Sequence, residues 1–115
     1  MNYTFAYCSN LNQDIDLSEL KNLTTMNGCF KGCSSFNGTV TLPDSVVEAE
    51  SAFEDCVEYD KPITFHTKIR NIIHCFKNCE SLNSVITIQY DNEPKYDYGA
   101  FDGCYSLDTK NVVRL

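Results

Sequence analysis

Apolar residues recur along this chain with a period of 23 to 25 residues, and a phenylalanine marks each period. The phenylalanines that set the period are Phe5, Phe30, Phe53, Phe76 and Phe101. A cysteine follows three positions after each of them, at Cys8, Cys33, Cys56, Cys79 and Cys104. An apolar or aromatic residue follows after six positions, at Leu11, Phe36, Tyr59, Leu82 and Leu107. Five units that agree in three columns predict a repeat protein in which each unit packs on the next.

The first four units also contain a short stretch in which apolar and polar residues alternate. These stretches span residues 14–18, 39–42, 62–66 and 85–89. Their apolar members are Ile15 and Leu17, Val40 and Leu42, Ile63 and Phe65, and Ile86 and Ile88. Alternation with β-branched residues is typical of a strand with one buried face. Because the stretch recurs in one orientation, we expect parallel strands stacked along an axis, ending with a strand at residues 111–115.

The segment from each Phe to the apolar residue six positions later faces the core from the other side. Its apolar side chains lie three residues apart, which is the period of a 3-10 turn or a single α-helical turn. Apolar pairs that precede three of the phenylalanines fill the return leg of each unit: Leu23 and Met26, Val46 and Ala49, and Ile69 and Ile72. No single unit can bury its apolar face alone, so we expect stacking to create the core.

The repeat resembles the BspA-type leucine-rich repeat, which carries Ala-Phe, a Cys and Ile-x-Leu-Pro. The matching segments are Ala52–Cys56, Ala100–Cys104 and Thr41–Val46, and the resemblance covers essentially the whole chain. It implies a right-handed leucine-rich repeat solenoid with a parallel β-sheet on one face and short 3-10 or helical turns on the other. The family is associated with adhesion and protein binding, which implies a cell surface or a virion as the location.

The chain of 115 residues is long enough for one core, so we expect a single leucine-rich repeat domain at residues 1–115. Neither end shows a recognisable cap of the kind that normally closes a solenoid. We therefore hypothesise that the chain is a segment of a longer solenoid, or that another chain covers one end. The second hypothesis describes a structural spacer or assembly component that packs end to end or forms homo-oligomers.

Composition narrows the classes of partner. The net charge is −7, and no cluster of Lys and Arg is present, so we expect no nucleic-acid partner. No run of about eighteen apolar residues occurs, so we expect no membrane insertion. The N-terminus lacks the basic and apolar regions of a signal peptide. Reduced cysteines would fit the cytoplasm, whereas the resemblance points to a cell surface, and the sequence leaves the compartment open.

The cysteine column is typical of small buried side chains, so we expect free thiols rather than disulfides. Two Cys-x3-Cys pairs, Cys29 with Cys33 and Cys75 with Cys79, raise the alternative of a zinc site that includes His74. The pairs lie two units apart, roughly 10 Å at the spacing of paired strands, which is too far for one ion. We therefore expect no metal and no cofactor. No nucleophile–base arrangement or phosphate loop is present, so we expect no enzyme.

The outward-facing residues of the alternating stretches form the predicted binding surface for a protein or glycan partner. They are Asp14, Asp16, Thr39, Thr41, Thr64, His66, Thr87 and Gln89. The fourth unit departs from the repeat with a longer segment that contains Tyr90, Tyr96 and Tyr98. Insertions in repeat proteins form loops, and Tyr is a favoured contact residue, so we expect these tyrosines to flank the surface. The alternative is an ordinary loop whose tyrosines cover the end of the sheet.

Overall fold

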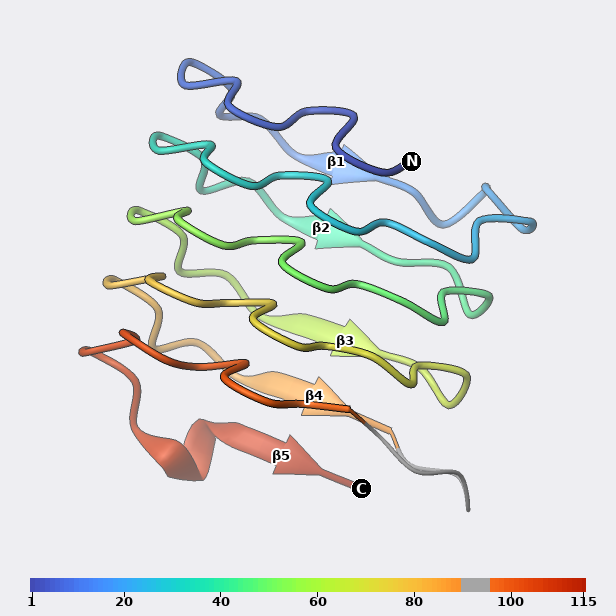
Figure 1. The fold of residues 1–115 in the computed structure, drawn as a ribbon. Helices are drawn as coiled ribbons and strands as arrows, with labels where there is room; N and C mark the ends of the chain where they lie inside the picture. Colours follow the sequence, from blue (N-terminus) through green and yellow to red (C-terminus); the bar gives the residue numbers. More distant parts are fainter. Residues whose placement is uncertain (90–95) are drawn as a thin grey trace.

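The computed structural model describes residues 1–89 and 96–115, and it contains five short strands, one from each unit (Figure 1). The strands are β1 (Ile15–Asp16), β2 (Val40–Thr41), β3 (Ile63–Phe65), β4 (Ile86–Ile88) and β5 (Val112–Arg114). Within these residues the only helix is a 3-10 turn, η1 (Thr109–Asn111). No helix of the described part is long and apolar enough to cross a membrane. The protein is therefore built from short strands and turns.

The strands form two parallel sheets, one with the order β1-β2 and one with the order β3-β4-β5. Ile15 lies opposite Val40, and Ile63 lies opposite Ile86, which in turn lies opposite Val112. Inward-facing residues therefore pair with inward-facing residues of the next unit. This register confirms the predicted parallel strands, including the one near residue 115.

The segments around the phenylalanines are chains of turns, and the expected short helices do not form there. In the second unit, the N–H of Cys29 donates to Met26 and the N–H of Cys33 donates to Phe30. The third residue of each turn has a positive φ, +63° at Gly28 and +74° at Gly32, which is the signature of a type II turn. These left-handed residues prevent propagation of a helix through the turns before and after Phe30, although the spacing of three residues predicted from the sequence is retained.

Backbone hydrogen bonds join neighbouring units along this turn side as well as along the sheet. The N–H groups of Gly28, Phe30 and Gly32 donate to the carbonyl oxygens of Glu50, Ala52 and Glu54, each over 2.8 Å. A further row of parallel bridges runs through the return legs, from Thr25 to Glu48, Asn71 and Tyr96. The five units consequently lie side by side in chain order, as Figure 1 shows.

The core runs through the middle of all the units. The rings of Phe30, Phe53 and Phe76 are fully buried, and their centroids lie 5.3 Å apart with nearly parallel planes. Phe36 and Tyr59 form a second stack beside them, with centroids 5.5 Å apart. The apolar columns predicted from the sequence are therefore the core, and stacked rings from successive units fill its centre.

The two outermost units depart from the predicted burial. Cys8 is exposed, and Phe5 and Phe101 are only partly buried, whereas Cys33 and Phe30 in the next unit are fully buried. Each inner residue packs between the unit before it and the unit after it. No described residue covers the outer side of Cys8, so the expectation that every thiol of the column is buried is wrong there.

Candidate functional site

The outward-facing residues of β1 to β4 are polar and lie on one face. The register places Asp16 beside Thr41 in one sheet and Thr64 beside Thr87 in the other. Asp14, Asp16, Thr39, Thr41 and Thr64 are exposed, whereas His66, Thr87 and Gln89 are partly buried. The alternation predicted from the sequence thus brings eight of the predicted binding residues onto one side of the protein.

A hollow lies in this face between β2 and β3, where the two sheets are separate. Its volume is about 420 Å³, and it is lined by Thr39, Val40, Thr41, Leu42, Pro62, Ile63, Thr64 and His66. No backbone hydrogen bond joins β2 to β3 in the described chain. Pro62, directly before β3, has no N–H to donate across the gap. The hollow therefore contains polar side chains of both strands and backbone groups that the sheet leaves unpaired.

The acidic residues of the face are engaged in local hydrogen bonds. Asp14 accepts a hydrogen bond from the backbone N–H of Thr39 over 2.8 Å, which fastens the first unit to the second. Asp16 accepts one from the N–H of Ser18 over 2.9 Å. The hydroxyl and the backbone N–H of Ser18 together lower the pKa of Asp16. Asp14 thus supports the fold, and the threonines are the freer polar groups.

His66 is the titratable group at the edge of the hollow. Its Nδ1 lies 3.5 Å from Oδ1 of Asp44, whose side chain is 89% exposed. An exposed pair of this kind contributes little to stability, typically under about 1 kcal/mol. His66 is therefore available for a ligand in the hollow as a donor or an acceptor.

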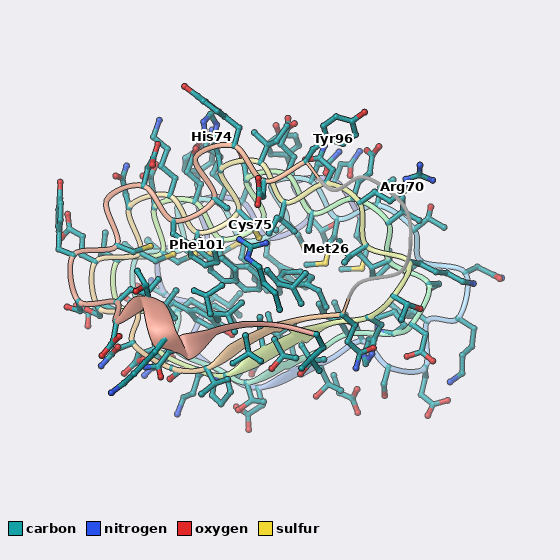
Figure 2. All side chains as sticks on the ribbon, turned by 90° about the horizontal axis from the view of Figure 1, so that it is seen from below. Met26, Arg70, His74, Cys75, Tyr96 and Phe101 are labelled. Atoms are coloured by element: carbon teal, nitrogen blue, oxygen red, sulfur yellow. The ribbon has the colours of Figure 1, made fainter. Side chains whose placement is uncertain are left out.

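Tyr96 and Tyr98 of the fourth unit do not flank this face. Tyr96 bridges to Asn71 in the return leg, and the carbonyl of Tyr98 accepts a hydrogen bond from the N–H of His74. Figure 2 places Tyr96 and His74 on the side of the molecule opposite the strands. Tyr98 is 76% exposed, and its ring lies against the His74 ring with centroids 5.7 Å apart. Tyr90 lies outside the described residues.

Sequence reasoning missed three exposed tyrosines and a second hollow. Tyr3, Tyr7 and Tyr105 are 56%, 66% and 83% exposed, and they lie outside the phenylalanine, cysteine and apolar columns of the repeat. A second hollow of about 220 Å³ lies where the chain leaves β1, β2 and β3. It is lined by Ser18, Lys21, Leu42, Pro43, Asp44, Ser45 and Lys68. Its two lysines belong to turns of different units, so only the stacked structure brings them together.

The described residues contain no group of His, Cys, Asp and Glu side chains that could hold a metal ion. His74 and Cys75 lie next to each other in sequence, but Figure 2 shows Cys75 inside the molecule and His74 outside. All seven cysteines are free, as expected. Burial raises the pKa of Cys29 and of Cys104 to about 11, so these thiols remain protonated near neutral pH.

Comparison with known proteins identifies the family. No curated protein and no solved structure matches this sequence. One protein family matches, described as "Mycoplasma protein of unknown function, DUF285", and the match covers residues 1–112. Because it spans nearly the whole repeat, the chain belongs to the DUF285 family.

Proposed function

We propose that this chain is a leucine-rich repeat solenoid of the BspA type that acts as a non-catalytic protein-interaction module. Three kinds of evidence support the solenoid: the period of 23 to 25 residues, the parallel register between successive strands, and the hydrogen-bonded rows on the turn side. Parallel connections of this kind are almost always right-handed, which gives the coil its expected hand. An extended face on a rigid stack offers a large contact area with little ordering cost.

The observation that carries this proposal is the hollow between β2 and β3 on the outward face. Thr39, Thr41 and Thr64 supply hydroxyls that both donate and accept hydrogen bonds. The unpaired edges of β2 and β3 add backbone donors and acceptors, which an extended peptide segment can satisfy. We therefore favour a protein partner whose extended segment lies along the hollow, in an adhesion-like or ligand-binding role. A glycan is the alternative partner on the same face.

Site-directed photo-crosslinking tests this surface. A photoreactive amino acid placed at Thr41 or Thr64 should capture a protein partner. Matched controls in the same two units, at the exposed Ser34 and Glu58, should not capture it. Equal capture from the control positions would place the binding surface elsewhere. Capture of carbohydrate instead of protein would favour the glycan alternative.

Affinity for the captured and purified partner provides the second measurement. Thr41→Arg and Thr64→Arg fill the hollow with bulk and charge, so we expect at least a ten-fold loss of affinity, roughly the effect of a contact worth 1.4 kcal/mol. Ser34→Arg and Glu58→Arg should change the affinity by less than about two-fold. Circular dichroism spectra should be the same for all four variants, because each replaced side chain is exposed.

A further inference from the structure

The turn side of each unit donates three backbone hydrogen bonds to the next unit. In the first unit the N–H groups of Tyr3, Phe5 and Tyr7 donate to the carbonyl oxygens of Asn27, Cys29 and Lys31, over 2.8, 2.8 and 2.7 Å. The donors stand at every second residue. Each acceptor lies one position before a donor of the next junction: Asn27, for example, accepts from Tyr3, and Gly28 donates to Glu50. Every junction between described units repeats this arrangement.

The equivalent N–H groups of the fifth unit and the equivalent carbonyl oxygens of the first unit form no such hydrogen bond within the described chain. In the fifth unit, the equivalent donors are the N–H groups of Gly99, Phe101 and Gly103, and none donates to another described residue. In the first unit, the equivalent acceptors are the carbonyl oxygens of Asn2, Thr4 and Ala6, and none accepts a hydrogen bond from a described residue. The first unit therefore has three free carbonyl acceptors at the spacing of the three free N–H donors of the fifth unit.

The side chains of these columns do not obstruct such a contact. Within the chain, the rings of Tyr3 and Tyr7 lean over Gly28 and Gly32 of the second unit, in the space where a Cβ atom would lie, so they point away from the open side of the first unit. Gly99 and Gly103 stand in these same two columns at the far end. They carry no side chain that could obstruct Tyr3 and Tyr7 of an adjoining first unit.

The core and the thiol column are also open at the ends. Phe5 and Phe101 are partly buried, and their stacking on Phe30 and Phe76, with centroids 5.5 and 5.6 Å apart, uses one face of each ring. Cys33 donates through its thiol to the carbonyl of the preceding phenylalanine, Phe5, over 2.9 Å. Cys8 is exposed and has no such partner in the described chain.

We propose that two copies of this chain associate head to tail, with the first unit of one copy stacked on the fifth unit of the other. The N–H groups of Gly99, Phe101 and Gly103 then donate to Asn2, Thr4 and Ala6 of the second copy. The phenylalanine stack continues across the junction, and Cys8 comes into contact with the Phe101 carbonyl. Such a heterologous contact leaves one donor end and one acceptor end free, so association continues beyond the dimer. These ends are distinct from the hollow between β2 and β3, so association is independent of binding there.

Arg114 opposes this association and limits its strength. It stands in the inward column of the sheet, opposite Ile88, and its guanidinium pairs with Asp97 over 3.2 Å at the C-terminal end. Stacking a second copy there partly buries this charged pair, which is costly. Arg114→Leu restores the apolar type that Leu17 and Leu42 have in the same column, so it should strengthen association.

A pair of substitutions at Ala6 tests the orientation of the contact. Ala6 directly follows Phe5, and the equivalent residues of later units include Lys31, Glu54 and, in the fifth unit, Asp102. Lys31 and Glu54 form an ion pair of 2.9 Å between adjacent units. Across the proposed junction, Ala6 of one copy therefore neighbours Asp102 of the other. Ala6→Lys places opposite charges side by side there, whereas Ala6→Glu places like charges together. Within one copy the neighbour of Ala6 is Lys31, so the same two changes affect the monomer in the reverse sense.

Sedimentation velocity from about 10 µM to about 1 mM provides the main measurement, because association depends on concentration. We expect species larger than the dimer at high concentration, and dissociation constants about ten-fold tighter for Ala6→Lys than for Ala6→Glu. The rate of Cys8 labelling by a thiol reagent should fall as the species grow. Equal association of the two Ala6 variants, growth that stops at the dimer, or a monomer throughout for the wild type, Ala6→Lys and Arg114→Leu would each overturn the proposal.

Discussion

The thiol of Cys56 donates a hydrogen bond to the carbonyl oxygen of Phe30, which lies 26 residues earlier, over 3.0 Å. The same carbonyl accepts the backbone N–H of Cys33 within its own unit, over 3.1 Å. Cys79 and Cys104 repeat the contact with Phe53 and Phe76. The cysteine column thus joins each unit to the one before it by a hydrogen bond as well as by packing.

Replacement of Cys56 by Ala should therefore destabilise the protein. The change removes a buried sulfur atom and one hydrogen bond, but Phe30 keeps the bond from Cys33, so we expect a loss of about 1–2 kcal/mol in the free energy of unfolding. Urea denaturation measures it. Cys8→Ala is the matched control, because Cys8 is exposed, and it should change the free energy by less than about 0.5 kcal/mol. Equal effects of the two changes would contradict a structural role for the thiol contact.

Buried thiols also predict a loss of stability in alkali. Burial raises the pKa of Cys29 and Cys104 to about 11, and it raises the pKa of Cys33 as well. In the unfolded chain a thiol titrates near about 8.5. Above that pH the unfolded state loses protons that the folded state keeps, so stability is complete below about pH 8.5 and falls as the pH rises toward 11.

Urea denaturation between about pH 7 and pH 10 measures this effect on the free energy of unfolding. Cys29→Ala is the control, because Ala52 and Ala100 occupy the same column, and removing one titrating thiol should reduce the alkaline loss. A free energy of unfolding that stays constant over this pH range would contradict the burial of the thiols.

Phe53 at the centre of the ring stack should be the residue most sensitive to truncation. Its ring lies 5.3 Å from both Phe30 and Phe76, and it is fully buried. Phe53→Ala should lower the free energy of unfolding by about 3–5 kcal/mol. Phe5→Ala, at the half-buried end of the same column, should cost clearly less in the same thermal or urea assay. A loss below about 1 kcal/mol for Phe53 would mean that the stack is not the core.

Gly28 should resist substitution for two separable reasons. Its φ of +63° disfavours any residue with a Cβ atom, and the Tyr3 ring occupies the space that a Cβ atom would need. Gly28→Ala should therefore cost more than the roughly 1–2 kcal/mol expected from backbone strain alone. Combining it with Tyr3→Ala should recover the part due to the clash and leave the part due to φ. A double variant no more stable than Gly28→Ala would show that Tyr3 does not contribute.

The sequence alone predicted the repeat, the strands and the inward columns, because side-chain type reports burial directly. It did not reveal the two columns of positive φ. Tyr3, Ser51 and His74 have φ values of +56°, +56° and +54°, close to that of Gly28. These residues share a backbone conformation but no side-chain chemistry. The helical turns expected from the spacing were wrong for the same reason, since a left-handed residue interrupts the turn from each phenylalanine to its cysteine.

A polar row also escaped the sequence analysis. The side chain of Asn12 accepts the N–H of Asn37 over 2.8 Å, Asn37 accepts that of Asp60 and Asp60 accepts that of Asn83, each over 2.8 Å. The residues stand one position after the apolar column, and each side chain fixes the next unit. Asn and Asp are common in turns for several reasons, so their residue types alone did not indicate contacts between units.

The candidate binding face was predictable only in part. Alternation within each strand indicated that Thr41 and Thr64 face outward, and the register brings the residues of this face together. The break between β2 and β3 depends on the distance between two backbones, which no side-chain pattern records. Tyr96 was expected to flank the face, but the bridge to Asn71 holds it in the return leg on the opposite side.

Tyr59 is the member of the second aromatic column whose polar group is not satisfied. Its side chain is fully buried between Phe36 and Phe53, with ring centroids 5.5 and 4.9 Å away, and its hydroxyl has no hydrogen-bond partner among the described residues. Burial raises the pKa of this hydroxyl, so it stays protonated at any moderate pH. A buried hydroxyl without a partner costs about 1–3 kcal/mol relative to its hydrated state.

Tyr59→Phe removes this cost and keeps the ring, so it should raise the free energy of unfolding by about 1 kcal/mol or more. Phe36 in the same column shows that the stack accommodates a phenylalanine. Phe36→Tyr is the mirror control: it adds a hydroxyl to a buried ring and should destabilise. Urea denaturation of both variants decides the matter, because a loss of stability in Tyr59→Phe would show that the hydroxyl forms a contact that stabilises the folded protein.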